Sequence, residues 1–565
     1  MSGQGIGQVL VYAVVLIALA YPLGLYMARV FGTLRAPRGL AGIERGFYRL
    51  LGTDPAKEQS WKSYGLTVLV FSLVFSGLLY LIQRLQGHLF LNPDGMKGVP
   101  SHLALNTTAS FVTNTNWQYY GGESTMSYLT QMAGLAVQQF VSAAVGIAVL
   151  VAVIRGIARR TAGTLGNFWV DFYRSLVYVL LPLTLVLAVI LMSQGVPQTF
   201  SGHATATTLE GATQVVTRGP AASMIAIKQL GTNGGGFWNS NSAVPFENPN
   251  GITNFLEMIA ILLIPAAQVF MFGKMVLARR HALMVFAAMF ALFAAGVAVN
   301  YTAEQHGSAV LRASGVSLAQ SSGSSGGNMQ DKEVRFGLAN TAVWTTATSD
   351  ASNGSVNGGF DAQTPAAGAV PLINLFVGEV IFGGVGSGLY GMFFYVVIAI
   401  FVAGLMVGRT PEWLGKKIEA REIKYAALGA LFVPTMVLTM TAVAIVTKSG
   451  LASIYNPGVH GFTETLYAYN SQSNNNGSAF AGYGLTNFSA EFGTVALYLG
   501  RFVPLLAALA FAGSLGKKKI VPASAGTFRT DGGTFAVLLV GVIVLTAGLM
   551  ILPALTLGPI VEGLK

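Results

Sequence analysis

Four short polar tracts in this sequence have the composition of a site that binds an ion through backbone oxygens. All four combine asparagine with small residues, and they read FVTNTNWQ (Phe111–Gln118), GTNGGGF (Gly231–Phe237), ASNGSV (Ala351–Val356) and NNNGSAF (Asn474–Phe480). Aligned on one another, they give a small hydroxyl or amide residue, then Asn, then Gly in three of the four copies. They recur about every 110 to 125 residues, and internal repetition indicates a fold more strongly than any single motif.

The chemistry that suits these tracts is the replacement of a cation's hydration shell. A bare cation in a low-dielectric medium costs roughly tens of kcal/mol, so oxygen ligands must replace its water. Glycine reaches the backbone dihedrals that turn successive carbonyls toward one axis, because it has no Cβ. Four such segments would form a ring of dipoles as in potassium filters, and neutral carbonyls hold a weakly hydrated monovalent cation without trapping it.

Two departures from the repeat leave the ligand assignment open. In the first tract, Trp117 stands where the other copies have glycine, so the ring is not fully four-fold. Asp350 precedes the third tract and would bring a carboxylate near the site, and an alignment on Thr348 and Ser349 is also compatible with the sequence. An isolated Asn-Gly pair is a common turn signal, but four copies at one period favour a shared function.

The elements that position the tracts are membrane-spanning helices. Of the 565 residues, 53% are hydrophobic and only 10% are charged, and there is no cysteine for a disulfide or thiolate site. Apolar runs of about 20 residues can cross roughly 30 Å of hydrocarbon. The sequence predicts an all-α integral membrane protein with about ten spans, near residues 9–31, 63–83, 131–154, 168–192, 254–278, 281–303, 371–407, 425–447, 488–515 and 533–556. A short apolar segment precedes each tract, so the repeating unit is helix, half-helix, tract, helix.

Basic residues follow every second span, and this pattern predicts the orientation. They are Arg29, Arg35, Arg38, Arg45 and Arg49, then Arg155, Arg159 and Arg160, then Lys274, Arg279 and Arg280, then Arg409, Lys416, Lys417, Arg421 and Lys424, and finally Lys517, Lys518, Lys519 and Arg529. The positive-inside rule places these five connections in the cytoplasm, and both termini and the four tracts outside.

Two charged residues and a glycine cluster fall inside apolar runs, where they are expensive and indicate function. A fixed cation below a filter would repel potassium, so Arg501 is a candidate gate and Glu379 a candidate to offset it or line an exit. The alternative is a buried ion pair, or an arginine that reaches the interface. Gly383, Gly384 and Gly386 predict a gating loop beneath the filter, because irregular backbone at that depth must line a cavity or be buried in protein. A close crossing of helices is the alternative.

Other residues point less clearly to a role. Glu247 and Glu257 are compatible either with support of the filter or with a place at the interface. The six histidines show no metal-ligand spacing. No GxxxxGK[ST] phosphate loop is present, and the basic connections are shorter than the roughly 50 residues that an independent domain needs. We therefore expect that this chain does not hydrolyse ATP, and that another polypeptide drives any uphill transport.

Longer motifs around the tracts resemble a known family. They are NTNWQ with GESTMSYLTQ (Gly122–Gln131), LGTNGGGFWNSNSAVPFENPN (Leu230–Asn250), GEVIFGGVGSGLYGM (Gly378–Met392), GRTPEWLGKKI (Gly408–Ile418) and NNNGSAFAGYG (Asn474–Gly484). Over nearly the whole chain, the sequence closely resembles KdpA, the potassium-binding, channel-like subunit family of bacterial Kdp potassium-transporting P-type ATPases. The resemblance implies the potassium-channel-like SKT superfamily fold, potassium as the transported ion without a covalent cofactor, and the inner membrane. It also implies a KdpB-like catalytic partner and two small membrane partners, KdpC-like and KdpF-like.

The resemblance also implies the ligands and the division of the chain. The potassium ligands would be Thr115 and Asn116 with neighbouring Gln118, then Thr232, Asn233 and Gly234, then Ser352, Asn353 and Gly354, and finally Asn475, Asn476 and Gly477. The four repeats would span residues 63–160, 168–280, 281–408 and 425–515, with additional helices at 1–31 and 533–556.

Three functions compete at this point. The leading hypothesis is a subunit that takes potassium from outside through the filter and passes it to an ATP-driven partner. A self-sufficient channel or symporter of the Trk/Ktr class shares the four-repeat plan. In a membrane scaffold, the glycine tracts would serve helix packing alone.

Overall fold

The structure is a computed structural model that describes residues 2–34, 38–406, 408, 410–522 and 527–564. Arg35 and Arg409 of the basic connections therefore lie outside the described residues. Within the described ranges, ten helical segments are long and apolar enough to cross a membrane, as predicted. They are α1 (Gly3–Gly32), α3 (Trp61–Leu85), α6 (Val137–Ala158), α7 with α8 (Phe168–Arg174 and Leu181–Ser193), α10 (Gly251–Met275), α11 (Arg279–His306), α15 (Ser387–Met406), α16 (Ala420–Val446), α19 (Asn487–Gly516) and α20 (Gly533–Leu555).

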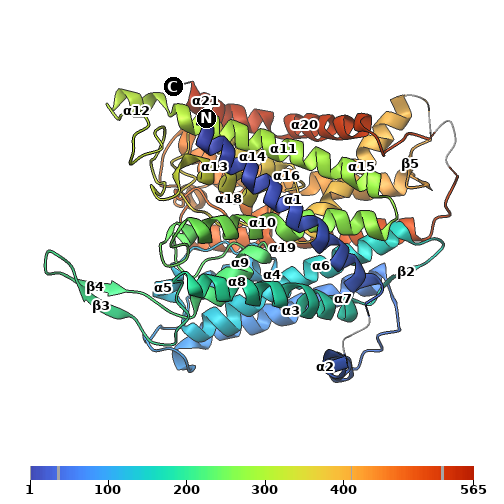
Figure 1. Ribbon diagram of the computed structural model, residues 1–565, viewed down its shortest axis with the longest axis horizontal. Coiled ribbons are helices and arrows are strands. Elements are labelled where there is room, and N and C mark those ends of the chain that lie inside the picture. The colour runs from blue at the N-terminus through green and yellow to red at the C-terminus, as the bar shows by residue number, and fades with distance from the viewer. Residues whose placement is uncertain (1, 35–37, 407, 409, 523–526, 565) are drawn as a thin grey trace.

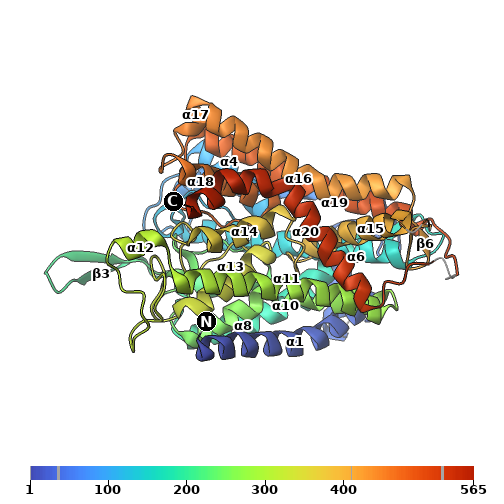
Figure 2. The same ribbon diagram turned by 90° about the horizontal axis from the view of Figure 1, so that it is seen from above.

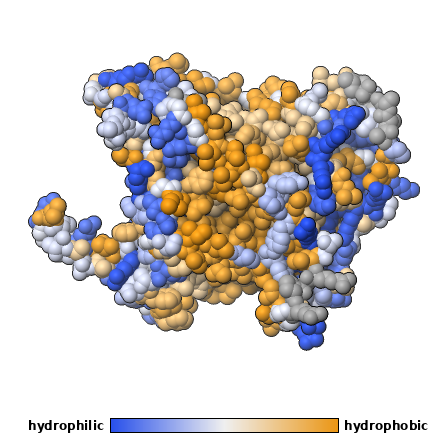
Figure 3. Space-filling view, in the orientation of Figure 1, coloured by the Kyte–Doolittle hydropathy of each residue, from blue (hydrophilic) through white to orange (hydrophobic). Residues whose placement is uncertain are grey.

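The long helices run in roughly one direction, and the surface shows why (Figure 1). An apolar band crosses the middle of the molecule, and hydrophilic side chains gather at its two ends (Figure 3). Both termini lie at the end that carries the hairpin of β3 (Ala204–Thr207) and β4 (Thr213–Val216) (Figure 1). The helix α2 (Arg38–Leu50) and the strand β5 (Glu412–Trp413) lie at the opposite end. These features are those of a multi-pass membrane protein.

Four shorter helices each lie between two long ones and end at a tract. They are α4 (Ser101–Val112), α9 (Ala221–Leu230), α13 (Gly337–Asp350) and α18 (Val459–Asn474). At about 1.5 Å per residue they reach at most roughly 24 Å, too short to cross the hydrocarbon. The long helix that follows each tract is α6, α10, α15 or α19, and these four are the most buried of the ten. The unit of helix, half-helix, tract and helix therefore occurs four times, and the turned view shows α1 and α20 along the outside (Figure 2).

The predicted span 371–407 is wrong, because this stretch is two helices with a break between them. Helix α14 (Pro365–Phe376) is too short to span, and α15 begins only at Ser387. Five residues between them have positive φ, which no helix accommodates. They are Gly378, Glu379, Phe382, Gly383 and Gly386. The alternative of a close helix crossing at the glycine cluster is also wrong, because residues 377–386 form an irregular loop.

The remaining elements are short. The helices are α5 (Gly122–Thr125), α12 (Ala309–Ala313), α17 (Lys448–Leu451) and α21 (Val561–Gly563), and the other antiparallel strand pairs are β1 (Gln59–Ser60) with β2 (Thr164–Gly166) and β5 with β6 (Lys416–Lys417). Helix α21 continues from α20 through a wide helical turn and packs against α14 and α18. This contact brings the end of the chain beside the fourth half-helix.

Candidate functional site

The four tracts share one backbone conformation. In each, an amide donates to the carbonyl five residues earlier: Thr115 to Ser110, Asn233 to Lys228, Asn353 to Thr348 and Asn476 to Ser471, with N–O distances of 2.8, 2.9, 3.1 and 2.9 Å. The residues on either side of that amide have positive φ in every copy: 114 and 116, 232 and 234, 352 and 354, 475 and 477. We call the three-residue segments 114–116, 232–234, 352–354 and 475–477 the ring segments. Alternation of left- and right-handed residues lets successive peptide groups face the same side, as a line of carbonyl ligands requires.

This conformation corrects the alignment of the first tract. Asn116, and not Trp117, occupies the position of the glycines, with a φ of 57°. Asparagine is one of the few residues with a Cβ that tolerates this region. Asn114 occupies the first position of the segment, which the sequence-based ligand set leaves out. The alternative alignment on Thr348 and Ser349 is wrong, because both residues lie inside α13.

The ring segments touch one another in a closed order. A Cβ on Gly234 would collide with the carbonyl of Asn353, and one on Gly354 with the carbonyl of Asn476. In the same way, a Cβ on Gly477 would collide with the carbonyl of Thr115. The first and second segments meet where the Asn114 side-chain amide donates to the Thr232 carbonyl at 2.8 Å. The four tracts therefore converge on one place, as predicted.

Asparagine side chains tie each segment to its neighbour. The Nδ2 of Asn353 donates to the carbonyl of Lys228 at 3.1 Å, and the Nδ2 of Asn476 donates to the carbonyl of Thr348 at 2.9 Å. Both acceptors belong to the last turns of the preceding half-helices. The Oδ1 atoms of the same two residues accept from the amides of Ser355 and Ser478 at 3.0 Å. These side-chain contacts hold the ring segments together.

The side chain of Gln118 links the first tract to the second by two hydrogen bonds. Its Oε1 accepts from the Gly236 amide at 3.0 Å, and its Nε2 donates to the Gly236 carbonyl at 3.1 Å. Both ends of the side-chain amide are therefore engaged by the second tract. This geometry favours a positioning role beside the ring.

The ring segments separate two hollows. On one side lies a pocket of about 490 Å³, which we call the vestibule. Residues of all four tracts line it, including the equivalent positions Asn116, Gly234, Gly354 and Gly477. On the other side, Asn474 and Asn475 line a smaller space of about 60 Å³, which we call the lower cavity. At roughly 10–15 Å³ for each enclosed water, the lower cavity has room for a few waters or a partly hydrated ion.

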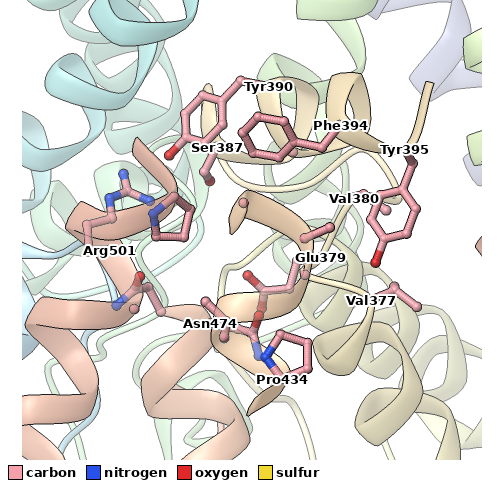
Figure 4. A pocket seen from close by; sticks show the side chains of 18 residues that line it. Val377, Glu379, Val380, Ser387, Tyr390, Phe394, Tyr395, Pro434, Asn474 and Arg501 are labelled. Carbon is pink, nitrogen blue, oxygen red and sulfur yellow. The ribbon is translucent and has the colours of Figure 1, made fainter. Parts of the chain in front are cut away.

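The two predicted membrane charges both line the lower cavity (Figure 4). The Oε1 of buried Glu379 accepts from the Asn476 side chain at 2.7 Å, so this carboxylate contacts a ring residue directly. Arg501 is 6% exposed, and no carboxylate of the described residues lies within 4.0 Å of it. Arg501 thus neither forms an ion pair nor reaches the surface. Its charge faces the cavity.

The irregular loop 377–386 lies against the inner side of the ring. The amide of Val385 donates to the Oγ1 of Thr232 at 3.0 Å, and a Cβ on Gly384 would touch the side chain of Ser352. The amide of Gly386 donates to the Oε1 of Gln268 on α10 at 2.8 Å. The loop therefore lies beneath the ring segments, where the sequence predicts it.

A buried polar network lies behind the second tract, and its central cation, Lys228, is not among the candidates that the sequence indicated. The ammonium of Lys228, which has no exposed surface, donates to Asn241 at 2.8 Å, Ser242 at 2.6 Å and Glu247 at 2.5 Å. Asn241 in turn donates to the carbonyl of Gly234 at 2.5 Å. Glu257 is also fully buried and accepts from Ser242 at 2.7 Å. Both glutamates therefore stand behind the ring, and an interfacial place for them is wrong.

Asp350 is the last residue of α13 and lies directly before the third tract. It is fully buried, and its two carboxyl oxygens have no hydrogen-bond partner among the described residues. The expected closeness of a carboxyl group to the tracts is confirmed.

Comparisons with known proteins show the family of the chain. A family model described as "KdpA: Potassium-transporting ATPase A subunit" matches residues 10–564. The chain is 55% identical to the potassium-transporting ATPase potassium-binding subunit of Sorangium cellulosum, over all of both chains. It is 54% identical to the protein of the same name from Brucella anthropi, over all of this chain and 99% of that one.

A solved structure supports the fold. The potassium transporter TrkH from Vibrio parahaemolyticus superposes with a TM-score of 0.53 and 14% sequence identity, covering 86% of this chain and 97% of that one. At that identity the likeness concerns the fold alone. From the full-length family match and the identity to both relatives, the chain belongs to the KdpA family, the A subunits of potassium-transporting ATPases.

Proposed function

We propose that this chain binds potassium in the ring and carries it into the membrane for a potassium-transporting ATPase. The observation that carries the proposal is the closed ring of four equivalent segments with one backbone conformation. Thr115, Asn233, Asn353 and Asn476 supply central carbonyls, and the residues on either side supply further ones. The four half-helices end at the ring, so their negative dipole ends favour a cation there.

The path of the ion follows from the two hollows. Potassium reaches the ring from the vestibule, loses its water to backbone oxygens, and enters the lower cavity between Glu379 and Arg501. The cation of Arg501 opposes straight passage through the membrane, and the loop 377–386 gates the way out. The ion is then handed to the ATPase subunit, which alone hydrolyses ATP.

The proposal includes an orientation and an assembly. The vestibule and both termini face outward from the bacterial inner membrane, because the basic connections gather at the opposite end. The chain divides into repeats at 63–160, 168–280, 281–408 and 425–515 with one additional helix at each end. Its partners are a KdpB-like ATPase subunit and the small KdpC-like and KdpF-like subunits.

A growth assay with potassium-requiring cells distinguishes this function from that of a Trk-like symporter. A symporter expressed alone would restore growth of potassium-requiring cells on low potassium. We expect this chain to restore growth only when its ATPase partners are co-expressed. Rescue by the chain alone would favour the symporter.

Ion-dependent stability separates it from a scaffold. We expect the purified complex to melt at a higher temperature in KCl than in NaCl of equal concentration. The reason is that potassium binds the folded state and stabilises it, whereas sodium does not bind the ring. At a hundred times the dissociation constant, the gain is about 2.7 kcal/mol. Equal melting curves in the two salts would support the scaffold.

Replacement of Arg501 by alanine tests the gate. For a separation of about 8 Å, two unit charges repel each other by roughly 2 kcal/mol at an effective dielectric constant of about 20, so loss of the cation should raise passive potassium flux about 30-fold. Flux into proteoliposomes without ATP measures this. Arg529→Ala is the matched control, because that side chain is 80% exposed and pairs with Asp531. Equal passive flux in the wild type and Arg501→Ala would remove the gating role.

A further inference from the structure

A histidine and three carboxylates meet at the vestibule end of the molecule, outside the ring. His460 and Glu464 lie one turn apart on α18, Asp361 precedes α14, and Glu562 belongs to α21. The Nε2 of His460 lies 2.9 Å from an Asp361 oxygen and 3.7 Å from a Glu464 oxygen. Its Nδ1 lies 2.8 Å from a Glu562 oxygen. Three segments distant in sequence therefore converge on one imidazole.

The cluster has more negative charge than one histidine can balance. Three ionised carboxylates and one protonated imidazole have a net charge of −2. No lysine or arginine of the described residues forms an ion pair with any of them. Glu464 has no exposed surface; its Oε1 accepts from the Asn456 side chain at 2.5 Å, and its Oε2 has no hydrogen-bond partner among the described residues. An unpaired buried carboxylate oxygen is costly, and a cation is what would satisfy it.

The donor set has the composition and second shell of a transition-metal site. One ligand atom each from Asp361, His460 and Glu464 lies within 4.8 Å of the others. On the far side of the imidazole, a Glu562 oxygen lies 2.8 Å from Nδ1. A carboxylate commonly occupies this position behind a metal-ligating histidine. Imidazole nitrogen selects zinc and its neighbours over the oxygen-seeking calcium and magnesium.

We propose that Asp361, His460 and Glu464 bind a divalent transition ion of the zinc class, with Glu562 orienting the imidazole. The side chains of Asp361 and His460 are 26% and 29% exposed, so an ion can reach them from the vestibule side. A bound ion would connect α21, through Glu562 and His460, more firmly to α18, the fourth half-helix. The site borders the vestibule, because His460 stacks on Phe480 and Asp361 follows Phe360, and both aromatic residues line that pocket.

The competing state is a clamp made by a protonated histidine without metal. Hydrogen bonds to Asp361 and Glu562 raise the pKa of His460 to about 10 in the metal-free cluster. A metal must displace the Nε2 proton, so the two states exclude each other. They differ in composition, since only one contains an ion, and this makes them separable by direct measurement.

Cobalt binding to the purified, tag-free complex tests the proposal. After EDTA treatment, Co²⁺ should add visible d–d absorption at one equivalent of this chain, and Zn²⁺ should displace it. His460→Gln should lower cobalt affinity at least about 100-fold, and Glu562→Gln about 10- to 100-fold through the second shell. His306→Gln is the matched control, because His306 joins no salt bridge among the described residues and its Nδ1 hydrogen-bonds to the carbonyl of Thr302 on its own helix.

The difference between variants decides the outcome. Other cobalt sites of the complex occur equally in the wild type, His460→Gln and His306→Gln, so their absorption cancels when one spectrum is subtracted from another. A difference spectrum between the wild type and His460→Gln, absent for His306→Gln, supports the site. Identical titrations of the wild type and His460→Gln would overturn it and leave the clamp. Neither result depends on potassium binding, so the test stands apart from the proposed function.

Discussion

Replacement of Gly234 by alanine is expected to weaken selective potassium binding strongly. Gly234 has a φ of 78°, and an added Cβ would collide with the carbonyl of Asn353 in the next ring segment. A left-handed residue with a side chain costs about 1–3 kcal/mol, and overpacking costs about 1–3 kcal/mol more. The carbonyl that must move is itself a proposed ligand. The two costs sum to about 2–6 kcal/mol, so affinity should fall by about 30-fold to 20,000-fold.

The control for this change separates strain from collision. Gly458 also has a positive φ, of 86°, but a Cβ there would meet nothing within 4 Å. Gly458→Ala should thus keep potassium-dependent stabilisation, while Gly234→Ala loses it. Both variants should elute as the assembled complex on size exclusion, which excludes a failure to fold. Potassium affinity of Gly234→Ala equal to that of the wild type would contradict the carbonyl ring.

The four-fold plan could be predicted from the sequence because the same backbone requirement recurs in four places and selects similar residues in each. Each copy needs left-handed residues directly after a half-helix, and Asn, Gly, Ser and Thr meet that need. The predicted alignment of the first copy is wrong because glycine marks the third position of the segment in the other three copies and is absent from this one. Asn116 meets the same backbone requirement with a different residue type. A count from the end of each half-helix finds the correct alignment, but that end is known only from the structure.

Features made by distant contacts were beyond the reach of sequence patterns. The partners of Lys228 lie 13 to 19 residues away in a loop without regular pattern. The histidine cluster joins residues about 100 positions apart, and its one local signal is the spacing of four between His460 and Glu464. The break at 377–386 was read as part of a span because its hydropathy remains high. Its glycines indicated the irregular backbone correctly.

Loss of the Lys228 cation is expected to have the second large effect. Lys228→Met keeps most of the side-chain volume but leaves Glu247 buried without its partner. Removal of one member of a buried pair costs about 3–5 kcal/mol. The damage should extend to the ion site, because Asn241, which Lys228 anchors, holds the carbonyl of Gly234. We therefore expect a lower melting temperature and a weaker stabilisation by potassium.

A second substitution shows whether the unpaired charge is the cause. In Lys228→Met with Glu247→Gln, the carboxylate that paired with Lys228 is also removed, so the double variant should recover part of the lost stability. The exposed Lys448 gives a matched control, and Lys448→Met should melt like the wild type. Melting curves with and without KCl measure all four proteins. A double variant less stable than Lys228→Met would mean that hydrogen bonds to Glu247, such as that from the Trp238 amide, matter more than its charge. A network that positions the ring should also make potassium affinity follow stability across the series, since the same contacts hold both.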